Sequence, residues 1–469
     1  MSHPSHAQIN DDLVRPLMRT SWRFYLLVAI PGSFVVAGLA SWLSQMYFGF
    51  GLSGLRWPVY WGFYVTNFVF WIGISHAGTL ISAILRLVNA GWRRPVTRCA
   101  EVITVFALLI GAMFPLIHLG RPWLAFWLFP YPSERLIWPN FRSPLVWDVF
   151  AISTYLIVSA TFFVLGMIPD IAAARDSTTV PWRKKLYTIL AFGWRGSGRQ
   201  WMHFNRAYLY LAALATPLVL SVHSVVSWDF AMSIVPGWHS TIFAPYFVAG
   251  AIFSGLAMVI TILIPVRKVF GLEAYFTPKH FDAMAKLILL TGMIVTYAYI
   301  AEIFLVWYSQ EPPHAEGQYI IAALSGPYWW AGAIMVLCNA VFPQLLWSRK
   351  VRTSIPAMFV ITIFINIGMW FERFVIIVVS LSHEYEPWQW NVYKPSWVEM
   401  GIMVGSFGWF FMWFLLFMRL LPAVSVAELK EVLPSPRRWA SRAARRDVEG
   451  TAPGTAYQPG QRLPDEEDR

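Results

Sequence analysis

The sequence predicts an all-α integral membrane protein of about ten transmembrane helices. Of its 469 residues, 57% are hydrophobic and only 13% are charged, whereas charged residues make up about a quarter of a typical soluble domain. Aromatic residues reach 17%, with 26 Trp, and many stand at the ends of apolar runs, where the membrane interface favours them. A lipid bilayer is therefore the expected environment.

Ten apolar stretches are long enough to cross the hydrocarbon core, which takes about 20 helical residues. The first contains Pro31 and Gly32, which predict a kink that neighbouring helices can accommodate. It is too long for the apolar part of a signal peptide and has no convincing cleavage site, so we expect it to be retained. The ten stretches are residues 24–48, 59–86, 101–118, 146–168, 207–227, 243–265, 286–308, 329–347, 355–380 and 398–418.

The basic residues divide unequally between the two sides of the membrane. With the N-terminus in the cytoplasm, 30 of the 36 Lys and Arg fall on the cytoplasmic side, and the outer segments 228–242 and 309–328 contain none. This asymmetry follows the positive-inside rule and requires an even number of helices. We therefore expect a multi-pass protein of the inner (cytoplasmic) membrane with both termini in the cytoplasm. The net charge of +11 then reflects topology and not nucleic-acid binding.

The same pattern divides the chain into three regions. Residues 1–23 form a cytoplasmic N-terminal segment, residues 24–418 a ten-helix membrane domain, and residues 419–469 a cytoplasmic tail. From Pro434 onward the tail is rich in Pro, Arg and acidic residues and has no apolar period, so we expect it to be flexible.

The two cysteines, Cys99 and Cys338, limit the cofactors that the chain can carry. They are too few for a disulfide framework, a four-cysteine iron–sulfur site or a CxxCH haem attachment. Any iron–sulfur cluster that takes part in the function must therefore belong to a partner protein.

Ionisable side chains within membrane spans are costly and are usually functional. His118 ends the third predicted helix and Asp148 opens the fourth, so the two flank one outer loop. A quinol releases two protons with its two electrons, and a histidine and a carboxylate at opposite ends of its ring can accept them. We interpret His118 and Asp148 as a candidate catalytic pair, with Arg121 tuning the acid or contacting a partner subunit. Simple capping of two helix ends is the alternative.

Three more charged residues lie in the outer halves of the seventh and ninth helices: Glu302, Glu372 and Arg373. Neighbours on a helix point about 100° apart, so we expect Glu372 and Arg373 to pair with other helices and not with each other. Glu302 has no basic neighbour in its own helix, which favours a protonatable carboxyl. All three are candidates for proton transfer, and for the Glu372–Arg373 pair a packing salt bridge is equally compatible.

On the second helix, His76 lies in a run of small residues that predicts close helix packing. It is a candidate proton relay, a haem ligand or a hydrogen-bonded core histidine. A haem with two histidine ligands would need His118 or His223 as the second ligand. Their positions along the third and fifth helices lead us to expect that neither matches His76 in depth, and we place His223 and Asp229 together at the outer end of the fifth helix.

Several short motifs follow one another along helices two to nine. Together they resemble the NrfD/PsrC family of quinone-interacting membrane subunits, and within it the ActC type, the quinol-oxidising subunit of alternative complex III. The motifs are Ile74-Ser-His-Ala-Gly-Thr-Leu-Ile-Ser-Ala83, His118-Leu-Gly-Arg-Pro122, Ser143-Pro-Leu-Val-Trp-Asp148, Glu302 to Trp307-Tyr-Ser309, Gly326-Pro-Tyr328, Cys338-Asn339 with Pro343-Gln344, and Asn366-Ile-Gly-Met-Trp-Phe-Glu-Arg373.

This resemblance implies two successive four-helix bundles, helices two to five and six to nine, with one peripheral helix on each side. It implies a subunit of a quinol:electron-acceptor oxidoreductase complex, respiratory or photosynthetic, that takes menaquinol or ubiquinol as substrate and allows coupling to proton translocation. The chain itself would bind no haem or iron–sulfur cluster. Its partners would be an iron–sulfur subunit on the periplasmic side, c-type haem subunits and a sister NrfD-like membrane subunit.

One loop departs from the family pattern, and two other functions stay open. The segment Ser382-His-Glu-Tyr-Glu-Pro387 is more acidic than the resemblance leads us to expect at a partner contact. A proton-coupled secondary transporter would use the same buried charges, but it would need a central substrate cavity with interrupted helices. A membrane cytochrome with haem b is the second alternative.

Overall fold

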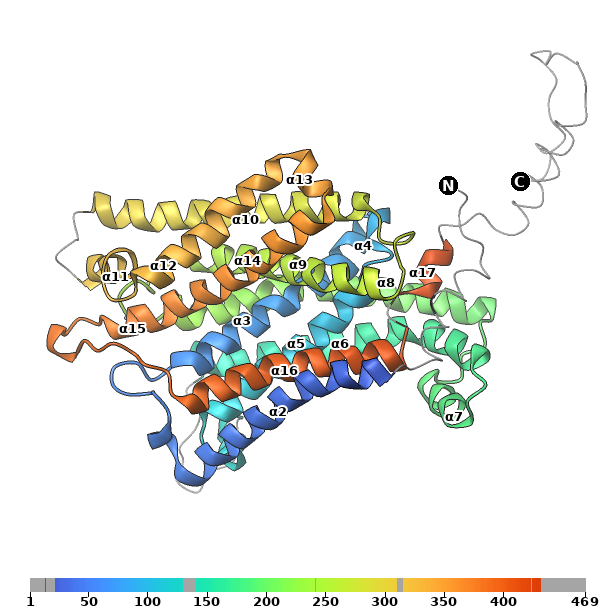
Figure 1. Cartoon of the computed structure of the whole chain (residues 1–469), viewed down its shortest axis with the longest axis horizontal. Coiled ribbons are helices and arrows are strands. Elements are labelled where there is room, and N and C mark those ends of the chain that lie inside the picture. Colours follow the sequence, from blue (N-terminus) through green and yellow to red (C-terminus); the bar gives the residue numbers. More distant parts are fainter. Residues whose placement is uncertain are drawn as a thin grey trace, which may run out of the picture.

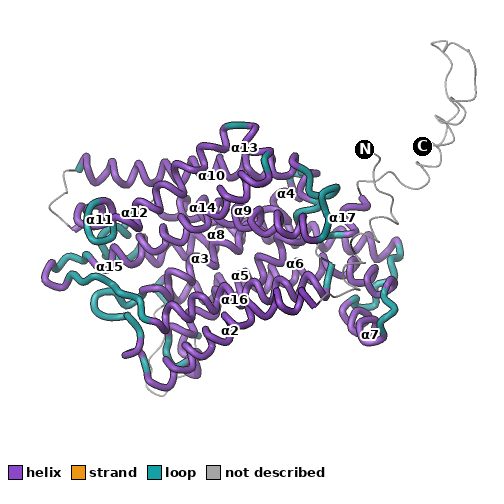
Figure 2. The backbone as a smooth tube through the Cα atoms, in the orientation of Figure 1, coloured by secondary structure: helices purple, strands orange, loops and turns teal. Residues whose placement is uncertain are grey.

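The computed structural model describes residues 13, 22–129, 141–240, 242–309, 315–422 and 424–431. Within them the regular structure is helical and contains no β-strand (Figure 2). Ten helices of the described chain are long and apolar enough to cross a membrane, and each coincides with one of the ten predicted stretches. The charges of the N-terminal segment before residue 22 and the tail beyond residue 431 lie outside the described residues.

The first five spans run from Trp22 to Ala231. The second is interrupted after α3 by a π-helical turn at Leu80–Ile84. α6 and α8 are each 34 residues long and extend well beyond their predicted apolar stretches. The short helix α7 (Pro181–Leu190) follows α6 and precedes α8 in the sequence. The elements are α2 (Trp22–Phe48), α3 (Gly62–Thr79) continued by α4 (Leu85–Leu87), α5 (Thr97–His118), α6 (Pro144–Ser177) and α8 (Gly198–Ala231).

The second five spans run from Phe243 to Leu420. The eighth span, Trp329–Trp347, is irregular. Its helix gives way to a π-helical and then a 3₁₀ turn, and Pro343 lacks the amide that would continue the ladder. The elements are α9 (Phe243–Val269), α10 (Pro278–Tyr308), α11 (Ala315–Leu324), α12 (Trp329–Val336), α13 (Arg349–Thr353), α14 (Ile355–Phe374) continued by α15 (Ser380–Ser382), α16 (Trp397–Leu420) and α17 (Val426–Glu431).

The packing of the spans is consistent with two bundles and a peripheral pair. α3, α5, α6 and α8 pack in succession, α9 packs with α10 and α14, and α12 packs against α14. α3 and α9 contact each other where the two groups meet. α2 packs along α16, and the two lie side by side at one edge of the molecule (Figure 1). We call the end with α7 and α17 the inner end and the opposite end, where α5 stops and α6 starts, the outer end.

Small residues set how closely these helices approach. A Cβ added at Gly78 would lie 1.9 Å from Thr104 Oγ1, and one at Gly255 would lie 2.4 Å from Ala77 Cβ. Both glycines lie at helix crossings of α3, which confirms the close packing predicted around His76. Between α2 and α16, a Cβ at Gly38 would lie 2.7 Å from Gly405 Cα, so that these two backbones meet directly.

Candidate functional site

His118 ends α5 at the outer end of the first bundle. Its Nδ1 is buried and has no hydrogen-bond partner, while the rings of Phe50 and Tyr64 lie edge-on at 6.3 and 6.2 Å. The Tyr64 hydroxyl donates to Gln45 Oε1, and Gln45 Nε2 donates to the Ile117 carbonyl at 3.2 Å. Aromatic and amide groups thus fix the surroundings of the imidazole but leave one ring nitrogen available to an incoming group.

Asp148 occupies the second turn of α6 and is buried, with an exposed fraction of 6%. It shares a hydrogen bond with Asp229, which lies near the end of α8. Two carboxyl groups in hydrogen-bond contact must hold a proton between them, because two like charges at that distance repel. The Oδ1 atoms of both residues are buried and have no partner. This pair can therefore accept or release a proton and still bind a further donor.

The structure brings Asp148 to Asp229, whereas His118 contacts other helices. The aromatic neighbours of His118 come from the α2–α3 side, and the ionisable neighbour of Asp148 comes from α8. Both residues nevertheless lie at the outer end, because α5 stops there and α6 begins there. Arg121 is exposed, and within the described part of the chain no hydrogen bond or ion pair joins it to Asp148. Sequence reasoning noted Asp229 but missed its pairing with Asp148.

A second group of polar side chains surrounds Glu372 in the other bundle. The Tyr299 hydroxyl donates to Glu372 Oε2, and Asn339 Nδ2 donates to the Tyr299 oxygen at 2.9 Å. Tyr246 is a further hydrogen-bond partner of Glu372. The same Asn339 Nδ2 also lies within hydrogen-bond distance of Glu372 Oε2, at 3.4 Å. The carboxyl therefore receives hydrogen bonds from α9, α10 and the π-helical turn after α12, so that three spans fix its position.

The expectation that Glu372 and Arg373 do not bond each other is wrong. Arg373 Nη1 donates to Glu372 Oε1 at 2.7 Å, and both side chains are almost completely buried. The 100° between neighbouring helical positions separates their Cβ atoms, but the long arginine side chain curls back far enough to reach the carboxylate. The guanidinium also lies 4.5 Å from the centre of the Phe247 ring, and its Nη2 has no hydrogen-bond partner.

Glu302 connects this group to the outer surface. Ser240 Oγ donates to Glu302 Oε1 at 2.9 Å. The carboxyl borders two cavities that share Tyr319: an outer one of about 280 Å³ beside His239 and Ser240, and an inner one of about 80 Å³ that reaches Tyr246 and Tyr299. Burial raises the pKa of Tyr319 on α11, with the nearby Glu302 adding to the effect, so its phenol is a neutral donor at physiological pH.

His76 and His223 are neighbours, which corrects the expected mismatch in depth. Their ring centres lie 4.5 Å apart in an edge-on arrangement, because His223 precedes the end of α8 by about two turns and so lies deeper than Asp229. His76 Nδ1 is 2.7 Å from the Ile72 carbonyl, but His76 Nε2 and both nitrogens of His223 have no partner. The two rings are in direct contact, so there is no room between them for the haem that a pair of histidine ligands would hold.

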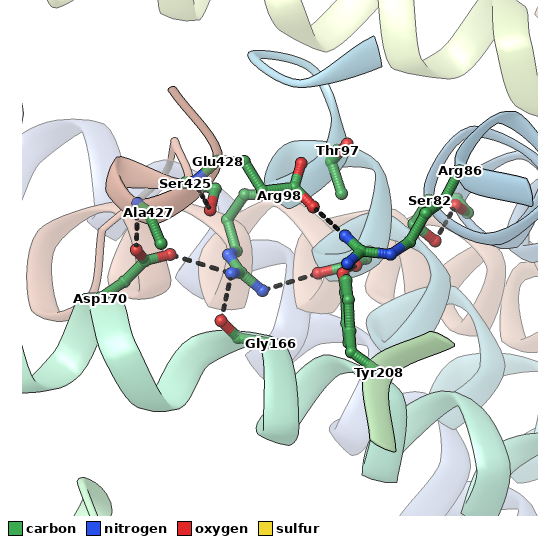
Figure 3. Close-up of polar contacts among 12 residues, drawn as sticks. Ser82, Arg86, Thr97, Arg98, Gly166, Asp170, Tyr208, Ser425, Ala427 and Glu428 are labelled. Carbon is green, nitrogen blue, oxygen red and sulfur yellow. Dashed lines mark hydrogen bonds and ion pairs between the residues drawn. The ribbon is translucent and has the colours of Figure 1, made fainter. Parts of the chain in front are cut away.

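A buried charge cluster at the inner end was missed by sequence reasoning. Arg98 donates to Glu101 at 2.6 Å and to Asp170 at 2.9 Å, and the Tyr208 hydroxyl donates to Glu101 at 2.6 Å (Figure 3). The predicted third helix begins only at residue 101 and leaves Arg98 in a basic loop. The i, i+3 spacing of Arg98 and Glu101 is the signal in the sequence that the helix begins before Arg98, because residues three apart are neighbours on a helix.

The helix α17 closes this cluster from the inner end. The amide of Ala427 donates to Asp170 at 3.0 Å, and Glu428 pairs with Arg93 at 2.9 Å and with Arg86 at 3.1 Å. Figure 3 shows Asp170, Arg98 and Tyr208 from three different spans converging beneath this segment. Residues 424–431 of the predicted cytoplasmic tail are thus part of the folded protein.

Smaller hydroxyl groups lie between the histidine pair and the inner cluster. The Tyr155 ring is 5.2 Å from that of His76, and its hydroxyl lies 2.8 Å from Thr79 Oγ1. Thr79 borders a small cavity of about 10 Å³ that also reaches Glu101. Ionisable and hydroxyl side chains therefore follow one another from the histidine pair to Glu101. Within the described residues no three His, Cys, Asp or Glu side chains are grouped so as to hold a metal ion.

Comparison with known proteins places these groups in a family context. The family described as polysulphide reductase, NrfD, matches residues 51–383, which is the stretch from just before α3 to the end of α15. The chain is 27% identical over 231 residues to a Halobacterium salinarum protein provisionally described as a membrane subunit of dimethyl sulfoxide reductase, with 49% of each chain covered. It is 24% identical over 234 residues to a selenate reductase subunit of Mesobacillus selenatarsenatis, with 48% of this chain and 53% of the relative covered.

The chain spans about half the length of these relatives. Both are named as subunits of reductases, and one is named as a membrane subunit, in agreement with the ten apolar helices found here. The family match, in contrast, covers well over half of the chain and includes both groups of four spans. The protein therefore belongs to the NrfD family.

Proposed function

We propose that this chain is the quinol-oxidising membrane subunit of an electron-transfer complex. The observation that supports it most is the set of unsatisfied buried atoms at the outer end: His118 Nδ1, Asp148 Oδ1 and Asp229 Oδ1. Leaving a buried polar atom unpaired costs about 1–3 kcal/mol, so such atoms call for a bound partner. The two hydroxyls of a quinol are suitable donors.

The reaction follows from these groups. A quinol that donates one hydroxyl to His118 and the other to the Asp148–Asp229 pair loses a proton at each end as its two electrons leave. The histidine takes one proton on its free nitrogen, and the carboxyl pair, which holds one proton already, takes the other. Both protons leave at the outer end, and the oxidised quinone has no hydroxyl left to donate, so its release is favoured.

The electrons must pass to a partner, because two buried cysteines supply too few thiolates for an iron–sulfur cluster. We propose an arrangement of the alternative complex III type: an iron–sulfur subunit over the outer end, c-type haem subunits beyond it, and a sister NrfD-like subunit in the membrane. The ActC-like motifs around His118 and Asp148 support this assignment. The relatives named as reductase subunits are compatible with the opposite direction, quinone reduction, at the same site.

Ionisable groups of the second bundle, together with the histidine pair of the first, support a proton-translocating role. Glu302, Glu372, Arg373 and the His76–His223 pair are not needed to remove protons from a quinol at the outer end. They would be needed if electron transfer moved further protons across the membrane. Glu302 opens toward the outer cavity, and the hydroxyl-lined stretch between His76 and Glu101 continues in the inner direction.

The test uses the assembled complex. His118→Ala and Asp148→Asn should each lower quinol:acceptor turnover by at least ~100-fold, the usual scale for the loss of a general base, without loss of assembly. His280→Ala is the matched control, because this histidine caps the inner end of α10 and should leave turnover unchanged. If either site variant keeps near-normal turnover, its side chain does not take part in quinol oxidation.

A further inference from the structure

The largest of the cavities described here lies at the inner end, and none of its lining residues belongs to the groups considered so far. It measures about 390 Å³ and lies between α6 and the first turns of α8. Leu165 and Ile168 of α6 form one wall, and Phe204 and Ala207 of α8 form the other. These side chains belong to membrane-spanning helices, so that this part of the groove is suited to an acyl chain.

The opposite margin of the groove is polar and basic. Arg199 and His203 line it from one face of α8, and both are exposed. Within the described residues neither side chain makes a hydrogen bond or an ion pair with the protein. Between Asp176 and Asp229 the sequence contains no acidic residue at all, and Asp176 is itself paired with Arg175 at 2.8 Å. The groove therefore carries positive charge that the protein does not neutralise.

Aromatic side chains fix the depth of this groove in the bilayer. Trp194 and Trp201 pack edge-on at 5.0 Å, and Phe204 lies 5.7 Å from Trp194. Tryptophan is enriched at the level of the lipid headgroups. Figure 1 shows α7 at the same end of the molecule, beyond the spans. The basic margin thus lies at headgroup level, with the apolar walls extending from it toward the membrane core.

From this arrangement we infer that the groove binds one anionic phospholipid of the inner leaflet. The phosphate lies against Arg199 and His203, and an acyl chain lies between the α6 and α8 walls. A basic pocket between transmembrane helices on the cytoplasmic side has the charge and shape to hold such a headgroup. A zwitterionic lipid of the same chain length lacks the net negative charge and binds more weakly.

Native mass spectrometry of the full-length chain in detergent tests this inference. Titration with phosphatidylglycerol should show one molecule bound to the wild type, and Arg199→Ala should weaken it about fivefold, the effect of one basic charge at a membrane surface. Arg199→Ala/His203→Ala should weaken it further. Arg206→Ala is the matched control, because it removes the same charge from the same helix outside the groove and should retain wild-type binding.

Four results would overturn the inference. Equal loss of phosphatidylglycerol in Arg206→Ala would mean that general surface charge holds the lipid. Binding of phosphatidylcholine with the same acyl chains as tightly as phosphatidylglycerol would mean that the anionic headgroup does not contribute to binding. Complete displacement by millimolar inorganic phosphate would leave an anion site with no acyl chain. A cross-link from position 199 to another protein of the assembled complex would identify the groove as a protein interface and would likewise contradict lipid binding.

Discussion

At the scale of single residues, the proposed proton chemistry depends on the carboxyl pair at the outer end. Asp148 was expected to act with His118 across a loop, whereas its closest ionisable partner is Asp229 on α8. A pair that shares one proton can receive a second when quinol is oxidised, and it holds that proton away from the reacting oxygen. Asp229 thus shares the proton-accepting role with Asp148 under the proposed function.

Asp229→Asn tests this shared role. Asparagine keeps a hydrogen bond to Asp148 but cannot share a proton. Because Asp148 itself remains, we expect quinol:acceptor turnover to fall by about tenfold, less than the ~100-fold that marks the lower end of losing an acid–base group outright. The pH profile of turnover should change shape as well. Asp229→Glu, which keeps the carboxyl, should recover part of the activity. A normal rate and pH profile for Asp229→Asn would mean that the pair only packs α6 against α8.

The residues of the second bundle predict a separation of proton movement from electron transfer. Glu302→Gln and Glu372→Gln should leave quinol oxidation in detergent largely intact and reduce the protons moved per electron in proteoliposomes. A charge at mid-membrane costs about 2.5–3.5 kcal/mol, so groups kept there without a role in quinol oxidation need another function.

Glu386→Gln, which alters an exposed carboxyl in the outer loop, is the control for these variants. Unchanged rates and proton ratios in both glutamate variants would assign the cluster a structural role. Collapse of turnover in detergent would instead make it part of the quinol site.

At the scale of elements, the hydrophobicity of the sequence predicted every span of the described chain. It did not predict which side chains contact one another between the spans. The ten apolar stretches correspond to ten helices because a membrane span must be long, apolar and helical. Its length and apolarity can be read directly from the sequence. The inner extensions of α6 and α8 were missed because their polar residues resemble a loop. The Arg373–Glu372 ion pair and the His76–His223 contact depend on how flexible side chains fold into shared space, which helical spacing alone does not determine.

The α2–α16 pair offers a test at this scale. A Cβ added at Gly405 would lie 2.6 Å from Gly38 Cα, so Gly405→Ala should force the two helices apart. Overpacking of this kind costs about 1–3 kcal/mol, and the thermal midpoint of the purified protein should fall accordingly. Gly32→Ala is the same substitution in the same pair, but its Cβ would meet only Met412 Sδ, at 3.9 Å. Equal midpoints for the two variants would contradict direct backbone packing.

At the scale of the whole molecule, the distribution of charge predicts its orientation. The basic residues gather at one end, and the folded helix α17 meets Arg86 and Arg93 at that same end. We expect both termini in the cytoplasm. Green fluorescent protein fused after Arg469 should therefore be fluorescent, and alkaline phosphatase fused there should be inactive. The reverse pattern would refute the topology and would move the proposed quinol site to the cytoplasmic side.

The family match covers the two groups of four spans and omits the α2–α16 pair, so the proposed chemistry lies within the shared part of the fold. The central claim is that quinol gives up its electrons beside His118 and Asp148. The most direct test is the double variant His118→Ala/Asp148→Asn in the assembled complex, assayed with quinol and with an artificial reductant that feeds the partner's redox centres directly. We predict that quinol-dependent turnover falls by at least ~100-fold while turnover with the artificial reductant is unchanged. Near-normal quinol-dependent turnover would contradict the account.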